Sequence, residues 1–199
     1  MFVILITMPK FCFGLDMWYN TPNMTLSGVP SGVKESSDSV SDLLKNMDLF
    51  DQFNRIRYRN VLQTFPDNYS LIFKMVPFLL HTNFRGLPGF VDHPETPCGI
   101  AYYSLDEETA YLVNKYFSKK CVIKEREARS TGFIEFLSVM GSVGSIAQTN
   151  RSDFDIWVGI RRDGVSPEAY RGFVEKLHDI ERWLDKMRME VHFFPTDII

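Results

Sequence analysis

Residues 139–158 read Val139-Met-Gly-Ser-Val-Gly-Ser-Ile-Ala-Gln-Thr-Asn-Arg-Ser-Asp-Phe-Asp-Ile-Trp-Val158, and this stretch combines a Gly-Ser turn with an Asp-x-Asp pair. An apolar run at 136–140 precedes the turn and is typical of a strand. After the turn, apolar residues alternate with acidic ones from 153 onward, which is typical of a half-buried strand. The stretch therefore predicts two strands joined at a turn, with negative charge gathered at one end of the second strand.

Asp153 and Asp155 are separated by one residue, so on a strand both carboxylates would lie on the same face. Two carboxylates held this close repel each other unless a cation lies between them. Mg²⁺ suits that position because it prefers a few carboxylate oxygens completed by water and substrate phosphates. An edge strand whose aspartates merely face solvent gives the same pattern, so the pair alone leaves both interpretations open.

Gly141 and Ser142 begin the turn between the two strands. Glycine lets a backbone approach a ligand closely, and successive amide hydrogens leading into a short helix would form an anion cradle. The hydroxyls of Ser142 and Ser145 are candidate donors to phosphate oxygens, although a flexible turn of small residues is the alternative. The stretch lacks the lysine of a Walker A loop and does not fit Gly-x-Gly-x-x-Gly, so neither a P-loop nor a Rossmann site is indicated.

The order of strand, Gly-Ser turn, short helix and Asp-x-Asp strand resembles the nucleotidyltransferase superfamily typified by DNA polymerase beta. Within that superfamily, residues 140–149 and 152–158 closely resemble the class I adenylate cyclases of bacteria. The resemblance covers the chain from about Asn60 to its end. It extends to three upstream segments and one downstream: Phe78-Leu-Leu-His81, Leu87-Pro-Gly-Phe90, Pro97-Cys-Gly-Ile100 and Met189-Glu-Val-His-Phe-Phe194.

This resemblance implies a catalytic site that uses Mg²⁺ or Mn²⁺. Asp153 and Asp155 match the acidic pair, and the superfamily places a third carboxylate on the strand after the next helix. Glu190 fits that pattern, with Asp197 as the reserve candidate, and an exposed strand residue is the alternative interpretation of Glu190. The resemblance thus assigns catalysis and metal binding to Asp153, Asp155 and Glu190, while His192 is expected to face the surface.

The implied reaction is cyclisation of ATP to 3′,5′-cyclic AMP with release of pyrophosphate. Gly141, Ser142 and Ser145 would hold the phosphate tail, and Ser152 would orient a carboxylate of the pair. Trp157 would wall the pocket or stack on the base, although a core tryptophan fits the pattern equally well.

Class I cyclases are much longer proteins, so we expect the core of this chain to be truncated on its carboxy-terminal side. Two other functions therefore stay open. One is a general nucleotidyltransferase that passes a nucleotidyl group to a hydroxyl acceptor, and the other is an inactive interaction module. ATP as the partner rests on the resemblance alone, because the motif would bind a triphosphate but contains no residue that selects a base. No motif points to a regulatory protein partner.

The composition is that of a soluble globular protein of 199 residues, with 45% hydrophobic and 24% charged residues. Its net charge of -3 argues against a nucleic-acid binder, which usually carries a basic surplus. Cys12, Cys98 and Cys121 are odd in number and widely spaced, which favours free thiols in the cytoplasm. The apolar run at 1–8 is too short to cross a bilayer and no basic residue precedes it, so no stable membrane insertion is expected.

The predicted fold class is α/β (α+β), with a nucleotidyltransferase-like mixed sheet, flanking helices and a helical extension before it. Residues 1–39 are expected to be a disordered tail and linker outside the fold. Residues 40–118 form the helical lead-in, whose apolar stripes are expected to be core and whose last helix would open at a Ser104–Glu107 capping box. Residues 119–199 form the core, with a helix starting at Ser166-Pro167 and a strand at 189–194.

Overall fold

The computed structural model describes residues 3–7, 37–64, 71–93, 95–101, 103–117, 132–149 and 152–198. The strands are β1 (Val3–Thr7), β2 (Ile134–Met140), β3 (Phe154–Ile160) and β4 (Val191–Asp197). The helices are α1 (Ser37–Thr64), α3 (Ile72–His81), α4 (Glu107–Phe117) and α5 (Pro167–Lys186). None of the helices in these ranges is long and apolar enough to cross a membrane.

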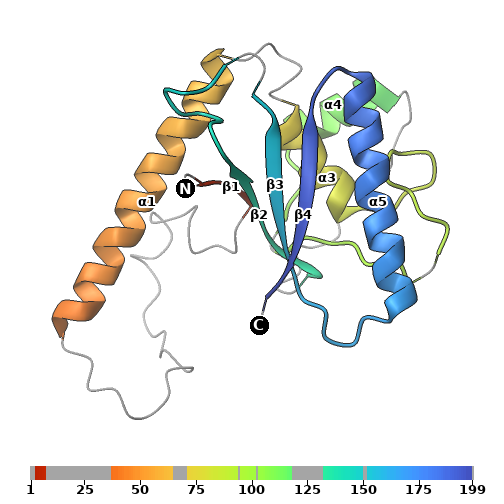
Figure 1. Ribbon diagram of the computed structural model, residues 1–199, viewed down its shortest axis with the longest axis horizontal. Helices are drawn as coiled ribbons and strands as arrows, with labels where there is room; N and C mark the ends of the chain where they lie inside the picture. Colours follow the sequence, from red (N-terminus) through yellow and green to blue (C-terminus); the bar gives the residue numbers. More distant parts are fainter. Residues whose placement is uncertain are drawn as a thin grey trace.

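The four strands form one sheet in the order β1-β2-β3-β4 (Figure 1). The two pairs β1–β2 and β2–β3 are antiparallel, whereas β3–β4 is parallel. A parallel pair needs a crossover connection, and α5 supplies it between β3 and β4. The predicted α+β class, with a mixed sheet and flanking helices, is therefore confirmed.

Strand β3 shows the predicted alternation of buried and accessible side chains. Phe154, Ile156, Val158 and Ile160 are fully buried. The ring of Phe73 in α3 meets Phe154 edge-on, with ring centroids 6.2 Å apart, so α3 packs on this face. The opposite face of the sheet carries Asp155 and Trp157, and it is more open.

Two predictions about the connections are corrected by the structure. We expected residues 1–39 to lie outside the fold, yet Val3–Thr7 pair with β2. Residues 37–39 belong to α1, and residues 1, 2 and 8–36 lie outside the described ranges. The backbone groups on that edge of β2 would otherwise be unpaired, and β1 satisfies them. No short helix joins β2 to β3 within 141–149, where the chain makes consecutive turns.

The helix starts in the second half of the chain follow the capping rules. Ser166 accepts a hydrogen bond from the Ala169 amide at 3.1 Å and Pro167 is the first residue of α5, as predicted. The start of α4 differs from the predicted capping box. Asp106, rather than Ser104, accepts from the Thr109 amide at 2.7 Å, because a carboxylate three residues before the amide has the reach of a cap.

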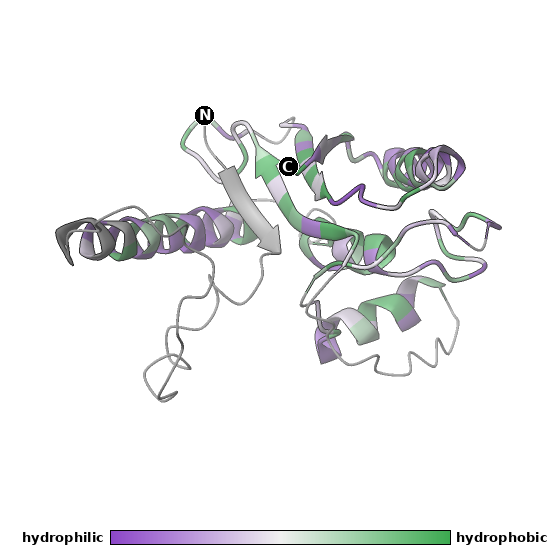
Figure 2. Ribbon diagram, turned by 90° about the horizontal axis from the view of Figure 1, so that it is seen from below, coloured by the Kyte–Doolittle hydropathy of each residue, from purple (hydrophilic) through white to green (hydrophobic). Residues whose placement is uncertain are grey.

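Helix α1 contradicts the prediction that its apolar stripe is core. It extends away from the sheet on the side opposite to α3, α4 and α5 (Figures 1 and 2). Leu44 is 60% exposed, and Phe50 and Phe53 are about two-fifths exposed. Within the part of the chain that the structure describes, the buried residues of α1 lie in its carboxy-terminal half. The buried contacts in that half come from Asn54, Arg57 and Val61.

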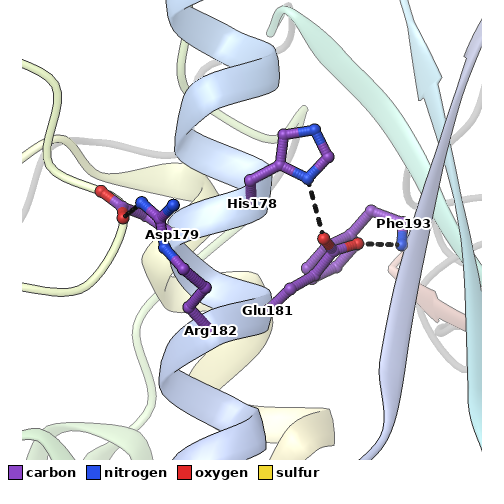
Figure 3. Close-up of polar contacts among 5 residues, drawn as sticks. All are labelled: His178, Asp179, Glu181, Arg182 and Phe193. Carbon is purple, nitrogen blue, oxygen red and sulfur yellow. Dashed lines mark hydrogen bonds and ion pairs between the residues drawn. The ribbon is translucent and has the colours of Figure 1, made fainter.

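The outer edge of β4 is closed to further strand pairing at two positions. The Ile198 amide bonds to Ile160 of β3, so the even-numbered amides face β3 and the odd-numbered ones face outward. The outward amide of Phe193 donates to the Glu181 carboxylate at 2.8 Å, and His178 contacts the same carboxylate (Figure 3). Pro195, the next outward position, has no amide hydrogen, which is how edge strands commonly avoid aggregation.

Lys176 of α5 is a buried cation, with only 1% of its surface exposed. Its Nζ donates to the carbonyl oxygens of Thr82 at 2.6 Å and Gly89 at 2.9 Å, which ties the loop after α3 to α5. Burial lowers the pKa of Lys176 from 10.5 to about 8, and the nearby Cys98 partly opposes this shift. Cys98, the cysteine in the described ranges, is intermediate in exposure.

Replacing Glu181 by Ala should lower the free energy of unfolding by about 1–3 kcal/mol, since the Phe193 amide would lose its acceptor in a partly buried position. Urea titrations measure this change. Glu181→Gln keeps an acceptor oxygen and should recover most of the loss, and Glu175→Ala on the exposed side of α5 is the matched control. Equal stabilities of Glu181→Ala and Glu175→Ala would contradict this role.

The buried Lys176 also predicts a dependence of stability on pH. Between about pH 8 and 10.5 the unfolded chain holds a proton on Lys176 that the folded protein has released, so stability gains as pH rises through this window. Relative to Lys176→Met, the wild-type free energy of unfolding should rise by up to about 3 kcal/mol across it. Parallel curves for the two proteins would show that Lys176 titrates normally.

Candidate functional site

The Gly-Ser turn follows directly from the end of β2. Gly141 has φ 85°, a backbone conformation that glycine adopts readily, and the chain reverses there. The Ser145 hydroxyl donates to the Ser142 carbonyl at 2.6 Å, and the Ser145 amide donates to the same oxygen at 2.9 Å. Because a serine hydroxyl has one hydrogen, Ser145 shapes the turn rather than offering the predicted donor to a phosphate.

The turn is joined to the start of the acidic strand by serine side chains. The hydroxyl oxygens of Ser142 and Ser152 lie 3.0 Å apart, and Ser152 also accepts from the Thr149 amide at 2.9 Å. Ser152, which we expected to orient a carboxylate, therefore contacts the turn instead. Ser142 remains partly exposed, and its contact with Ser152 brings the predicted turn next to the residue that precedes Asp153.

The register of β2 and β3 places the turn and the carboxylates at one edge of the sheet. Met140, the last residue of β2, pairs with Asp155, and Asp155 pairs in turn with His192 of β4. Asp153 is exposed just before β3, and Glu190 is exposed just before β4, where its carbonyl accepts from the Phe154 amide at 3.0 Å. All three predicted carboxylates therefore lie at the same end of the parallel pair.

The charges at this edge influence one another. Burial raises the pKa of Asp155, and the negative charges of Asp153 and Glu190 raise it further, while His192 lowers it. Among the described residues, no three carboxylate, histidine or cysteine side chains lie close enough to hold a metal ion by themselves. A Mg²⁺ ion at this edge would therefore need ligands besides these carboxylates, such as phosphate oxygens and water.

Asp197, the reserve candidate for the third carboxylate, lies at the opposite end of the sheet. It pairs with Ile160, five residues along β4 from the partner of Asp155, which is a distance of about 16 Å. Its carboxylate is 3.1 Å from Arg162, in an exposed ion pair. The structure therefore excludes Asp197 from this site, because strand β4 carries it away from the edge where β4 begins.

Trp157 lies on the open face of the sheet, two residues beyond Asp155. It is 36% exposed, and its register partner Phe194 is 45% exposed. The interpretation of Trp157 as a core residue is thus wrong. Trp157 and its register partner Phe194 are instead both exposed, and Trp157 shares the face of Asp155.

Arg57 and Asn60 of α1 also contact the turn, and sequence reasoning missed both. Arg57 donates through Nη2 to the carbonyls of Val143 and, at 3.1 Å, Gly141, while Asn60 Nδ2 donates to the Gly144 carbonyl at 3.2 Å. Burial lowers the pKa of the Arg57 guanidinium. A signal was present, since Arg57 follows Phe53 by four residues and so interrupts the apolar stripe of the helix.

Comparison with known proteins gives the family. Residues 42–198 match the adenylate cyclase NT domain. The chain belongs to this family. The match includes the turn, all three carboxylates and the half of α1 that contacts the turn.

The relatives that the chain matches are much longer proteins. The adenylate cyclase of Haemophilus influenzae is 34% identical over 149 residues, which are 71% of this chain and 17% of that protein. The adenylate cyclase of Pasteurella multocida is 30% identical over 76% of this chain and 19% of its own length, and that of Escherichia coli is 26% identical over 74% and 17%. This chain therefore spans under a fifth of these relatives. No solved structure matches it significantly.

Replacing Asp153 by Asn should lower the pKa of Asp155, because one of the negative charges that raise it is removed. Carbon-13 NMR titration of the aspartate carboxyls in metal-free buffer measures the change. Asp163→Asn, in the exposed turn after β3, is the control and should leave Asp155 unaffected. An Asp155 pKa that is the same in wild type and Asp153→Asn would show that the two carboxylates do not interact.

Proposed function

We propose that this protein is an adenylate cyclase of the class I type, which converts ATP into 3′,5′-cyclic AMP and pyrophosphate with Mg²⁺ or Mn²⁺ in the cytoplasm. The observation that supports it best is the pairing of Met140 with Asp155, which brings the Gly-Ser turn and the acidic pair to one edge of the sheet. A triphosphate and its metal ion need such neighbours, and the relatives named above are adenylate cyclases.

The carboxylates of Asp153 and Asp155 would hold the metal ion, with Glu190 at the rim of the same site. When bound, the ion would neutralise the charge that builds on the leaving pyrophosphate. Burial and the neighbouring negative charges raise the pKa of Asp155, and a cation placed between the carboxylates would offset the repulsion among them, which supports this role. These features support the proposal of a nucleotidyltransferase-like centre.

The remaining residues would bind and orient the nucleotide. Ser142 offers an amide and a hydroxyl to the phosphates, and the hydrogen bonds of Ser145 and Ser152 keep the turn in shape around it. Trp157 and Phe194 are exposed register partners on neighbouring strands, so they would offer aromatic surface on which a base can stack. In-line attack of the ribose 3′-hydroxyl would then depend on how firmly the phosphates are held.

Incubation of the purified chain with ATP and Mn²⁺ tests the proposal. We expect cyclic AMP and pyrophosphate in equal amounts, with the rate reduced at least a hundredfold in Asp153→Asn, because the metal ion loses a ligand. Asp163→Asn changes the same residue type ten positions along the chain and should match wild type. Calorimetry with ATP, performed on all three proteins, separates binding from turnover.

Other outcomes would favour the other functions. Binding of ATP without a cyclic product, but with transfer of labelled AMP to a hydroxyl acceptor, would identify a general nucleotidyltransferase. A stably folded protein that binds neither ATP nor metal would contradict both enzymatic proposals and leave an interaction module.

A further inference from the structure

Arg57 has an environment that its helix does not explain. Most of α1 is exposed, yet the Arg57 side chain is 1% exposed and lies against a turn that is 84 residues away in sequence. Burying a guanidinium is costly unless its charge is offset by hydrogen-bond acceptors. Two carbonyl oxygens of the Gly-Ser turn are among its acceptors, so part of this compensation comes from the candidate site.

The contacts between α1 and the turn are continuous. Arg57 donates to the Gly141 and Val143 carbonyls, and Asn60, one helical turn later, donates to the Gly144 carbonyl. A Cβ added to Gly144 would lie 2.6 Å from the Arg57 carbonyl oxygen, so only glycine permits this approach of the two backbones. Three carbonyls of the turn thereby face α1.

The direction of these carbonyls fixes the direction of the amides. In a trans peptide the carbonyl and the following N–H point in opposite directions. Since the Gly141 carbonyl is directed at Arg57, the Ser142 N–H is directed away from α1. The Ser142 hydroxyl contacts Ser152, which precedes Asp153, so this hydroxyl lies on the acidic-strand side of the turn.

We propose that Arg57 is a positioning residue for triphosphate binding, which holds the turn so that the Ser142 donors face the phosphates. This inference rests on the proposed function. A planar guanidinium can bond two carbonyls in a fixed geometry, whereas a lysine ammonium is a compact point charge on a flexible stem. Arg57 itself does not touch the nucleotide, and it acts through the peptide groups of residues 141–144.

The test compares Arg57→Met, Arg57→Lys and Arg59→Met in the full chain. Arg59 lies two residues along α1 on the exposed side, so it is the matched control. Nitrogen-15 relaxation reports the order of the turn amides, and calorimetry with tripolyphosphate and Mg²⁺ reports phosphate binding. In Arg57→Met we expect the order parameters of Ser142 and Gly144 to fall below about 0.6, and tripolyphosphate to bind about tenfold more weakly, a loss of about 1.4 kcal/mol.

Arg57→Lys should give an intermediate loss and Arg59→Met none, while the amides of β3 keep their wild-type order in every variant. Unchanged order of the turn, or unchanged tripolyphosphate affinity, in Arg57→Met would overturn the proposal. Loss of hydrogen-exchange protection along all of α1 would also overturn it, by showing that Arg57 only anchors the helix. If wild-type protein does not bind tripolyphosphate, the proposed function fails, and relaxation still shows separately whether Arg57 orders the turn.

Discussion

The pairing of Met140 with Asp155 is the constraint on which the arrangement of the site depends. It puts the turn that ends β2 beside the carboxylates that begin β3. A slip of one residue would reverse the faces of the strand, and a slip of two would move the carboxylates about 7 Å from the turn. The fully buried side chains of β3 resist the first change, because they would have to move from the core to the open face.

Elements far apart in sequence bring the other residues to this edge of the sheet. The crossover through α5 returns the chain so that β4 begins beside β3, which brings Glu190 and His192 to the same end as Asp155. Helix α1 reaches the turn from the other side, and Arg57 and Asn60 bind its carbonyls. The buried cations Arg57 and Lys176 have comparable tasks, since each secures a loop by binding two carbonyl oxygens.

The parts of this structure that the sequence predicts are those set by local physics. The alternation in β3 and the Ser166-Pro167 start of α5 each depend on residues a few positions apart in the sequence, and both are confirmed. The contacts of Arg57 are formed across 84 residues, and the pairing of β1 with β2 spans an even longer separation, so no local pattern reports them. The stripe of α1 was misjudged because periodicity shows that a helix has an apolar face without showing what covers it. The sequence alone allows Asp197 as a candidate, because it does not show that β4 runs away from the edge where Asp155 lies.

Paramagnetic broadening by Mn²⁺ in the presence of ATP tests most directly whether the turn and the acidic pair form one site. Substoichiometric Mn²⁺ added to nitrogen-15-labelled protein should broaden the amide signals of Ser142, Asp153, Asp155 and Glu190 together. The signals of Asp163 and Asp197, at the other end of the sheet, should remain sharp. Broadening centred on Asp197, or broadening of Asp153 and Asp155 that leaves Ser142 unaffected, would contradict the account.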